Sequence, residues 1–364
     1  MAPSQAKTPI ASTWRALEGQ SVTEILAQHP DPLSALHAGE VPAIVLRRVL
    51  GEQTVNHTST MLQRLFELHA QMNTSGNTPG NTSGSFNAQR PPGGPLWKTR
   101  SQAFASYGTD FNSLAASGGK IADYVESSRA FLRSYVDHGL TAPIDAILSS
   151  LGRLGWQTRL ARDTVSGQNF APGIFRRQGQ GAHTEVHFDT LHGATIWDSR
   201  VCGVGVPNRK YYQPANLSTP QLKAKIERHN VLQESFADMF SLPDHFSAVA
   251  TLSAPTAGAS NHTRPDVTVY DAHWSRLVND CSVYGSSHNS GVNIYGRLDR
   301  MHPLPRKHHL VLQAGDIYII NSHNIHVVNR VVSSGDWTKT HHARLTFGSF
   351  ISVDARQREL RMWS

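Results

Sequence analysis

Residues 313–331, QAGDIYIINSHNIHVVNRV, combine a turn with a strand whose far end lies close to a histidine, His326. Gly315 and Asp316 are typical of a turn, Ile317 to Ile320 of a buried strand, and His326 follows near the far end of that strand. Similar short segments, β-branched or aromatic and bounded by Gly, Pro, Asn or Ser, recur at 183–191, 245–255, 265–274 and 342–353. We therefore expect a β-rich module beyond about residue 168.

The chain before this module has helical periodicity. Residues 41–72 begin with a short apolar run and continue with helical spacing, which predicts a strand leading into a helix. Residues 121–154 carry two amphipathic patterns that break at Gly139 and Pro143. Residues 73–95 are rich in Asn, Thr, Ser and Gly, a composition typical of a mobile surface loop. A further helical stretch, 219–240, interrupts the β-rich module and predicts an insertion.

Composition excludes several classes of function. The 364 residues carry a formal charge of +7, but they contain no run of five Lys or Arg, and the basic residues alternate with acidic ones. We therefore expect no nucleic-acid partner. No segment approaches the ~18 consecutive apolar residues of a membrane span, so no membrane partner is expected. Only Cys202 and Cys281 are present, which favours a reducing compartment and a cytoplasmic location.

The segment 183–192, HTEVHFDTLH, supplies candidate metal ligands. Residues i and i+2 of a strand point to the same face, so His187 and Asp189 can reach one ion. With His326 they form a set of two histidines and one carboxylate, which holds Fe(II) on one face and leaves three positions open. The same donors also suit a zinc site.

Other histidines near these positions leave alternatives open. His323 precedes His326 by three residues, which on an extended chain places the two on opposite faces, so only one can serve. His183 and Glu185 share the face of His187 by parity and remain candidates to line the pocket. His192 lies past the strand and is expected to be solvated or locally bonded.

Arg344 and Thr346 share one face of the last long strand. A guanidinium can bind a carboxylate through two parallel hydrogen bonds, and a neighbouring hydroxyl can add a third. This pair would suit a dicarboxylate co-substrate.

The order His187-x-Asp189, then GDIYIINSHNIH with His326, then Arg344-x-Thr346, resembles the iron(II)- and 2-oxoglutarate-dependent oxygenase superfamily. The similarity covers roughly residues 165–355. It implies an α+β protein with a double-stranded β-helix (jelly roll), in which His187, Asp189 and His326 bind iron and Arg344, beside Thr346, binds 2-oxoglutarate. The long separation between the two histidines departs from the family pattern, and the helical insertion explains it. The distance from His326 to Arg344 is also longer than in many members.

On this interpretation the chain divides into a loose N-terminal arm (1–30), a helix-rich support region (31–160), a jelly-roll catalytic core (161–355) with a helical insertion at about 203–245, and a C-terminal tail (356–364). The resemblance implies a cytoplasmic dioxygenase that uses Fe(II), 2-oxoglutarate and O2 to oxidise an unactivated C–H bond. The expected substrate is a small molecule, a free amino acid or a specialised metabolite. Hydroxylation is the default, with ring closure or desaturation as its alternatives.

Two other functions remain open at this point. One is a 2-oxoglutarate oxygenase that acts on a protein or nucleic acid, and the other is a non-catalytic jelly-roll protein that binds metal. Four residues with side chains suited to recognising an amino acid or an aromatic metabolite could contact the substrate: Tyr211, Tyr212, Trp274 and Arg276. The sequence predicts neither the substrate nor the oligomeric state.

Overall fold

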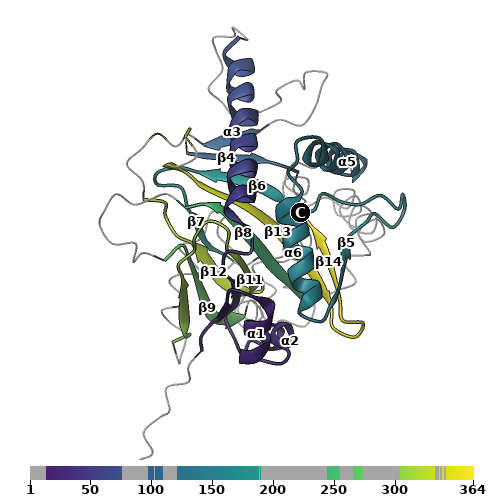
Figure 1. The fold of residues 1–364 in the computed structure, drawn as a ribbon, viewed down its shortest axis with the longest axis vertical. Helices are drawn as coiled ribbons and strands as arrows, with labels where there is room; N and C mark the ends of the chain where they lie inside the picture. Colours follow the sequence, from purple (N-terminus) through teal and green to yellow (C-terminus); the bar gives the residue numbers. More distant parts are fainter. Residues whose placement is uncertain are drawn as a thin grey trace, which may run out of the picture.

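The computed structural model describes residues 14–75, 97–101, 103–109, 121–187, 189, 244–254, 265–273, 298, 304–332, 336, 338–339 and 342–364. Nearly all of the predicted loop 73–95 and of the predicted insertion 203–245 lies outside these residues. So do His192, Cys202, Cys281 and the four candidate substrate contacts. Within the described residues the fold is a sheet-rich mixture of helices and strands (Figure 1).

Within the described residues, the named helices are α1 (Val22–Gln28), α2 (Pro32–His37), α3 (Glu52–Ser75), α5 (Ile121–Asp137) and α6 (Ala142–Arg153). The predicted pair of helices at 121–154 is confirmed, and the chain leaves the first of them through Gly139 at φ 64°. That left-handed conformation favours glycine because it lacks a Cβ. Among the described helices, none is long and apolar enough to cross a membrane.

A ten-stranded sheet forms the centre of the molecule, in the order β1-β2-β11-β8-β13-β6-β4-β3, with β14 paired to β13 and β5. Its strands are β1 (Leu17–Gly19), β2 (Ala43–Leu46), β3 (Lys98–Ser101), β4 (Phe104–Tyr107), β5 (Gln157–Leu160), β6 (Ile174–Gln178), β8 (Asp244–Ser253), β11 (Ile317–Asn321), β13 (Arg344–Asp354) and β14 (Glu359–Trp363). The predicted strand before a helix at 41–72 is confirmed as β2 followed by α3.

A second, four-stranded sheet has the order β10-β9-β12-β7. It contains β7 (Thr184–His187), β9 (Val267–His273), β10 (Lys307–Leu310) and β12 (Asn324–Val328). From β6 to β13 the chain crosses repeatedly between the sheets: β6, β8, β11 and β13 belong to the large sheet, and β7, β12 and the consecutive pair β9 and β10 to the small one. The two sheets are therefore built from interleaved segments of one stretch of chain.

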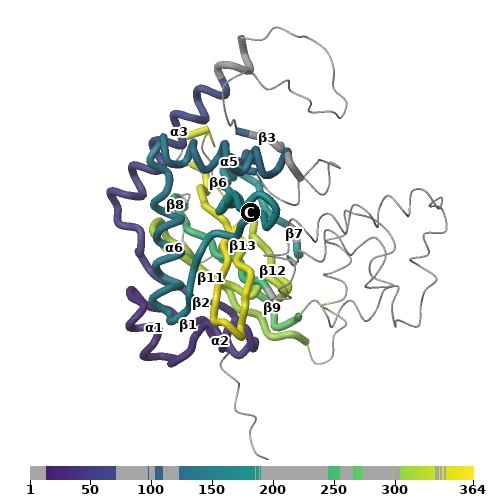
Figure 2. The backbone as a smooth tube through the Cα atoms, turned by 90° about the vertical axis from the view of Figure 1, so that its right-hand side faces the viewer, coloured from purple at the N-terminus to yellow at the C-terminus, as the bar shows by residue number. Residues whose placement is uncertain are grey.

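Period-2 alternation gives the large sheet two buried faces. On β8, Phe246 and Ala248 join a core cluster that includes Leu62 and Phe66 of α3. Val249, between Ala248 and Ala250, belongs instead to a cluster shared with the small sheet. Side chains that alternate along a strand leave on opposite faces. The result is three layers, in which α3 and α6 cover one face of the large sheet and the small sheet lies on the other (Figure 2).

Both ends of the described chain differ from the sequence interpretation. The predicted loose arm was wrong for residues 14–30, because β1 pairs in parallel with β2 and Ile25 of α1 is fully buried. Ser21 caps α1 by accepting a hydrogen bond from the backbone N–H of Glu24, a local signal that the sequence contained. The predicted tail at 356–364 was also wrong, since β14 pairs with β13 and β5 and buries Met362. The support region contributes strands as well as helices.

Candidate functional site

Strand pairing brings the three predicted metal ligands together. In the antiparallel pair of β7 and β12, His187 lies directly opposite His326. Asp189 follows β7, and its backbone N–H donates to the carbonyl of Ser322 at 2.9 Å, in the turn that leads into β12. Two adjacent strands and one backbone hydrogen bond thus fix the relative positions of all three side chains.

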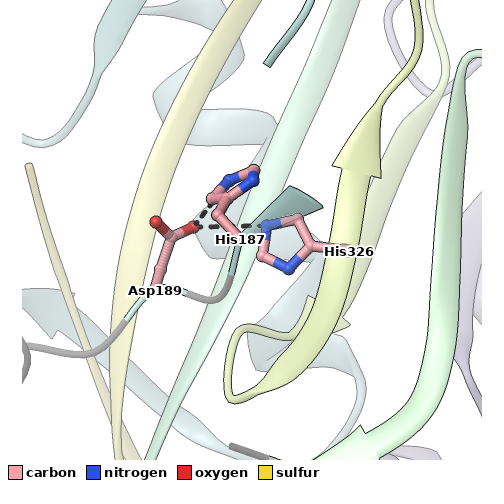
Figure 3. A group of neighbouring side chains, drawn as sticks. All are labelled: His187, Asp189 and His326. Carbon is pink, nitrogen blue, oxygen red and sulfur yellow. Dashed lines mark ion pairs between the residues drawn. The ribbon is translucent and has the colours of Figure 1, made fainter. Parts of the chain in front are cut away.

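The three side chains converge in space (Figure 3). The Asp189 carboxylate oxygen Oδ2 lies 3.4 Å from Nε2 of His326 and 3.9 Å from Nε2 of His187. One ligand atom from each residue lies within 4.8 Å of the other two. Donors that bind an ion at about 2.0–2.2 Å and at right angles are about 3 Å apart. The two Asp189 distances would need to shorten by less than about 1 Å, and the distance between the histidine nitrogens by less than about 2 Å, to place all three donors around one ion.

Hydrogen bonding sets the orientation of the His326 ring. Nδ1 of His326 lies 2.9 Å from the carbonyl oxygen of Asn324. A carbonyl only accepts, so Nδ1 donates this hydrogen bond, and Nε2, which faces Asp189, is the nitrogen that would bind an ion. A backbone carbonyl partner of this kind is typical of metal-binding histidines. The residues present thus fit a divalent ion of the iron or zinc type.

Charge also favours a metal ligand at Asp189. Burial alone would raise the pKa of this carboxyl, but the charge of His187, the hydrogen bond and charge of His326 and the charge of Arg176 hold it well below its usual range. The carboxylate is therefore ionised at neutral pH. His326 is only 4% exposed, whereas the side chains of His187 and Asp189 are 28% and 24% exposed. The group is thus covered on the His326 side and accessible on the other.

The structure separates the rival histidines from this group. His323 is buried, and its Nε2 lies 3.3 Å from Nδ1 of His245. His183 is exposed, and its Nδ1 lies 3.0 Å from the carbonyl of Gly181, so it does not line the site. The backbone of Glu185 belongs to β7, but its side chain lies outside the described residues.

Arg344 begins β13 and is 4% exposed. Its Nε donates to Oε1 of Gln178 at 2.8 Å, and its terminal nitrogens donate to the backbone carbonyls of Asn329 at 3.0 Å and Asp266 at 3.4 Å. The Asp266 carboxylate lies 3.8 Å from Nη1. These partners come from the ends of strands in both sheets, and they hold the guanidinium in a defined position.

Two further side chains accompany Arg344. Thr346 is 9% exposed, and its position two residues further along β13 places it on the same face. Tyr318 of β11 belongs to the cluster between the two sheets. Burial raises the pKa of Tyr318 to about 12, against the lowering effect of the charges of Arg344 and Arg176. The electrostatic influence of both arginines therefore reaches the space between the sheets.

The sequence interpretation missed Arg176 and Tyr318. Both lie in short strands, and alternation could have placed them: Tyr318 is flanked by two isoleucines that face the helices, and Arg176 pairs with Thr346 across β6 and β13. Without the strand order, nothing in the sequence said that these strands share a sheet with Arg344. Their position on the inner face of the large sheet, the face of Arg344, is a product of tertiary structure.

Comparisons with known proteins found no matching family model and no matching curated protein. Among solved structures, an N-substituted L-amino acid dioxygenase from Burkholderia ambifaria AMMD matches with a TM-score of 0.42 and 13% identity, over 91% of this chain and 90% of that one. The non-heme alpha ketoglutarate dependent carbocyclase SnoK from nogalamycin biosynthesis matches with a TM-score of 0.37 and 10% identity, over 88% and 85%. HygX from Streptomyces hygroscopicus, solved with nickel and 2-oxoglutarate bound, matches with a TM-score of 0.34 and 13% identity, over 91% and 95%.

Proposed function

We propose that this chain is an iron(II)- and 2-oxoglutarate-dependent oxygenase that oxidises a C–H bond of a small molecule. The observation that carries the proposal is the group formed by His187, Asp189 and His326, whose ligand atoms all lie within 4.8 Å of one another. Two histidines and one carboxylate on one side of an ion leave positions on the other side for a chelating co-substrate and for O2.

We propose further that the strands β6 to β13 form a double-stranded β-helix. Strands divided between two facing sheets, with the orders β11-β8-β13-β6 and β10-β9-β12-β7, support this architecture. It would enclose an interior between the sheets, lined by Val249, Ile320 and Val269 among others. The metal ligands come from the small sheet, and Arg344 from the large one.

Each residue then has a role set by its surroundings. His187, Asp189 and His326 would hold iron, with His326 oriented by the carbonyl of Asn324. The iron, when bound with 2-oxoglutarate, supplies the oxidising chemistry. Arg344, whose guanidinium still has N–H groups beyond those donated to protein acceptors, would bind the distal carboxylate of 2-oxoglutarate together with Thr346. The apolar inner faces of the sheets would exclude water from the reacting atoms.

Hydroxylation is the outcome we propose by default. Asp189 would serve as an iron ligand, so no ligand position would be vacated for a halide. Ring closure and desaturation depend on how the substrate is placed, to within about an ångström. A mass gain of one oxygen in the product indicates hydroxylation, and a loss of two hydrogens indicates one of the other two outcomes.

The test is iron-dependent turnover of 2-oxoglutarate. We expect the purified protein to convert 2-oxoglutarate to succinate with Fe(II) and O2, and to bind 2-oxoglutarate anaerobically only when metal is present. His326→Ala should abolish both, while His323→Ala, a neighbouring buried histidine outside the group, should retain them. A protein that bound zinc tightly but neither bound nor consumed 2-oxoglutarate would be a non-catalytic metal protein, contrary to this proposal.

A further inference from the structure

Arg176, in the middle of β6, faces the space between the sheets. It pairs with Thr346 of β13, and the neighbouring residue Arg177 points the opposite way, over the ring of Phe66 of α3. The Arg176 guanidinium passes over Gly348, since a Cβ built on that glycine would lie 2.6 Å from Nη1 of Arg176. The absence of a side chain at residue 348 therefore gives this arginine room to lie along the inner face of the sheet.

Arg176 also lies within electrostatic reach of the candidate metal site. Its positive charge is one of the influences that lower the pKa of Asp189, after those of His187 and His326. The charge of Arg176 also lowers the pKa of Tyr318, although burial has the larger effect and raises that pKa. Asp189 follows a strand of the small sheet and Arg176 belongs to the large one, so the two residues come from opposite sides of the space between the sheets.

Arg344 and Arg176, the two arginines on the inner face of the large sheet, differ in the protein groups that they contact. Arg344 is held by Gln178, by two backbone carbonyls and by the Asp266 carboxylate at 3.8 Å. For Arg176, no hydrogen-bond acceptor and no ion-pair partner is found in the described part of the chain. Keeping a half-buried guanidinium without a partner costs desolvation free energy. A carboxylate that binds beside it is stabilised by a bidentate, charge-assisted hydrogen bond.

We propose that Arg176 binds a carboxylate of the molecule that is oxidised, so that the substrate of this enzyme is an organic acid. The inference rests on the proposed function, which assigns Arg344 to the co-substrate and the metal group to iron. An acid held by Arg176 would lie across the interior from the open side of the metal group, where His187 and Asp189 are exposed. Arg176 would then select substrates by charge and orient them, while the metal site performs the reaction.

The experiment compares acids with their uncharged amides. Protein loaded with zinc, as a redox-inert substitute for iron, and with saturating 2-oxoglutarate is titrated with a panel of linear fatty acids and N-acetyl amino acids, each beside its primary amide. Ligand-observed NMR gives the dissociation constants. We expect at least one acid to bind at least about tenfold more tightly than its amide, and we expect Arg176→Gln to remove this preference.

Two further variants separate charge from placement. Arg176→Lys keeps the positive charge and should retain part of the preference for the acid. Gly348→Ala leaves every charge in place, but its methyl group would displace the guanidinium, so the preference should fall although Arg176 is still present. A preference unchanged in Arg176→Gln, or no acid that binds better than its amide, would overturn the inference.

Binding of 2-oxoglutarate, measured first on the same samples, distinguishes the two levels of proposal. If the wild-type protein does not bind 2-oxoglutarate, the proposed function is wrong, and the inference about Arg176, which depends on it, is wrong as well. If 2-oxoglutarate binds normally and no acid is preferred, only the role of Arg176 is wrong. If Arg176→Gln weakens 2-oxoglutarate as strongly as loss of Arg344 does, Arg176 belongs to the co-substrate site and the inference is likewise overturned.

Discussion

Replacement of Arg344 by Met should weaken 2-oxoglutarate binding by about 10- to 100-fold. Three N–H groups of Arg344 already donate to Gln178, Asn329 and Asp266, which leaves the remaining ones for a ligand. A hydrogen bond to a charged group contributes about 1.5–3 kcal/mol, and each 1.4 kcal/mol corresponds to a factor of about ten in affinity. The expected loss of affinity corresponds to one such hydrogen bond, because the guanidinium has few N–H groups left for 2-oxoglutarate.

The same substitution also removes donors from the protein itself. Gln178 loses its partner, and the Asp266 carboxylate, 21% exposed, loses the nearby positive charge. We therefore expect Arg344→Met to lower the melting temperature as well. A double variant that adds Asp266→Asn removes the negative charge that Arg344 no longer balances and keeps an acceptor oxygen for the backbone N–H of Leu312. It should recover part of the stability without recovering 2-oxoglutarate affinity.

Isothermal titration calorimetry of the anaerobic, metal-loaded protein with 2-oxoglutarate measures the effect directly. Arg330→Met, at an exposed arginine just after β12, controls for the loss of one positive charge. The assignment of Arg344 is refuted if the dissociation constant of the folded variant stays within about twofold of the wild-type value.

Three further predictions concern metal binding, acid stability and the core. His326→Ala should abolish stoichiometric Fe(II) binding, measured by elemental analysis, while His323→Ala should leave it intact; the reverse result would show that the β12 register is wrong. Asp31→Asn, which keeps the cap on α2 but loses the ion pair with Arg358, should destabilise the protein by no more than about 1 kcal/mol at pH 7. Burial opposes this shift, yet Arg358 and Ser34 lower the Asp31 pKa from its ordinary 3.8 to about 2, so the difference from wild type should shrink as the pH falls through that interval; a difference that grew in acid would contradict the ion pair. Ile319→Ala, at a fully buried position of β11, should cost about 2–5 kcal/mol in urea unfolding, and a cost below about 1 kcal/mol would argue against the packing described here.

The sequence predicted which residues of the site share a strand face, but not which strands bring those residues together. Two-residue spacing placed His187 and Asp189 on one face, and the Gly315-Asp316 turn marked the strand before His326. The direct pairing of His187 with His326 depends on which strands are neighbours, and that is decided by long-range packing. For the same reason Arg176, separated from Arg344 by more than 160 residues of chain, could be related to it only through the β6 and β13 register.

The two ends of the chain were misjudged for a different reason. Their strands are short, and short strands carry little periodic signal. Leu17–Gly19 and Glu359–Trp363 become strands because a neighbour is available: β2 for the first, and β13 and β5 for the second. Their burial is a consequence of the large sheet, and no local propensity would have revealed it.

β7 is four residues long and lies at the margin of the small sheet, where β12 is its only described neighbour and the pairing is irregular between His326 and Val328. An ion bound by residues on both strands of this pair would hold β7 against β12 and stabilise an otherwise weakly attached strand. Loss of the ion would then loosen one specific edge of the protein while the helical layer stayed intact. Amide hydrogen exchange in residues 184–187 should therefore accelerate when metal is removed, and the same loosening would open a route for ligands to enter and leave the interior.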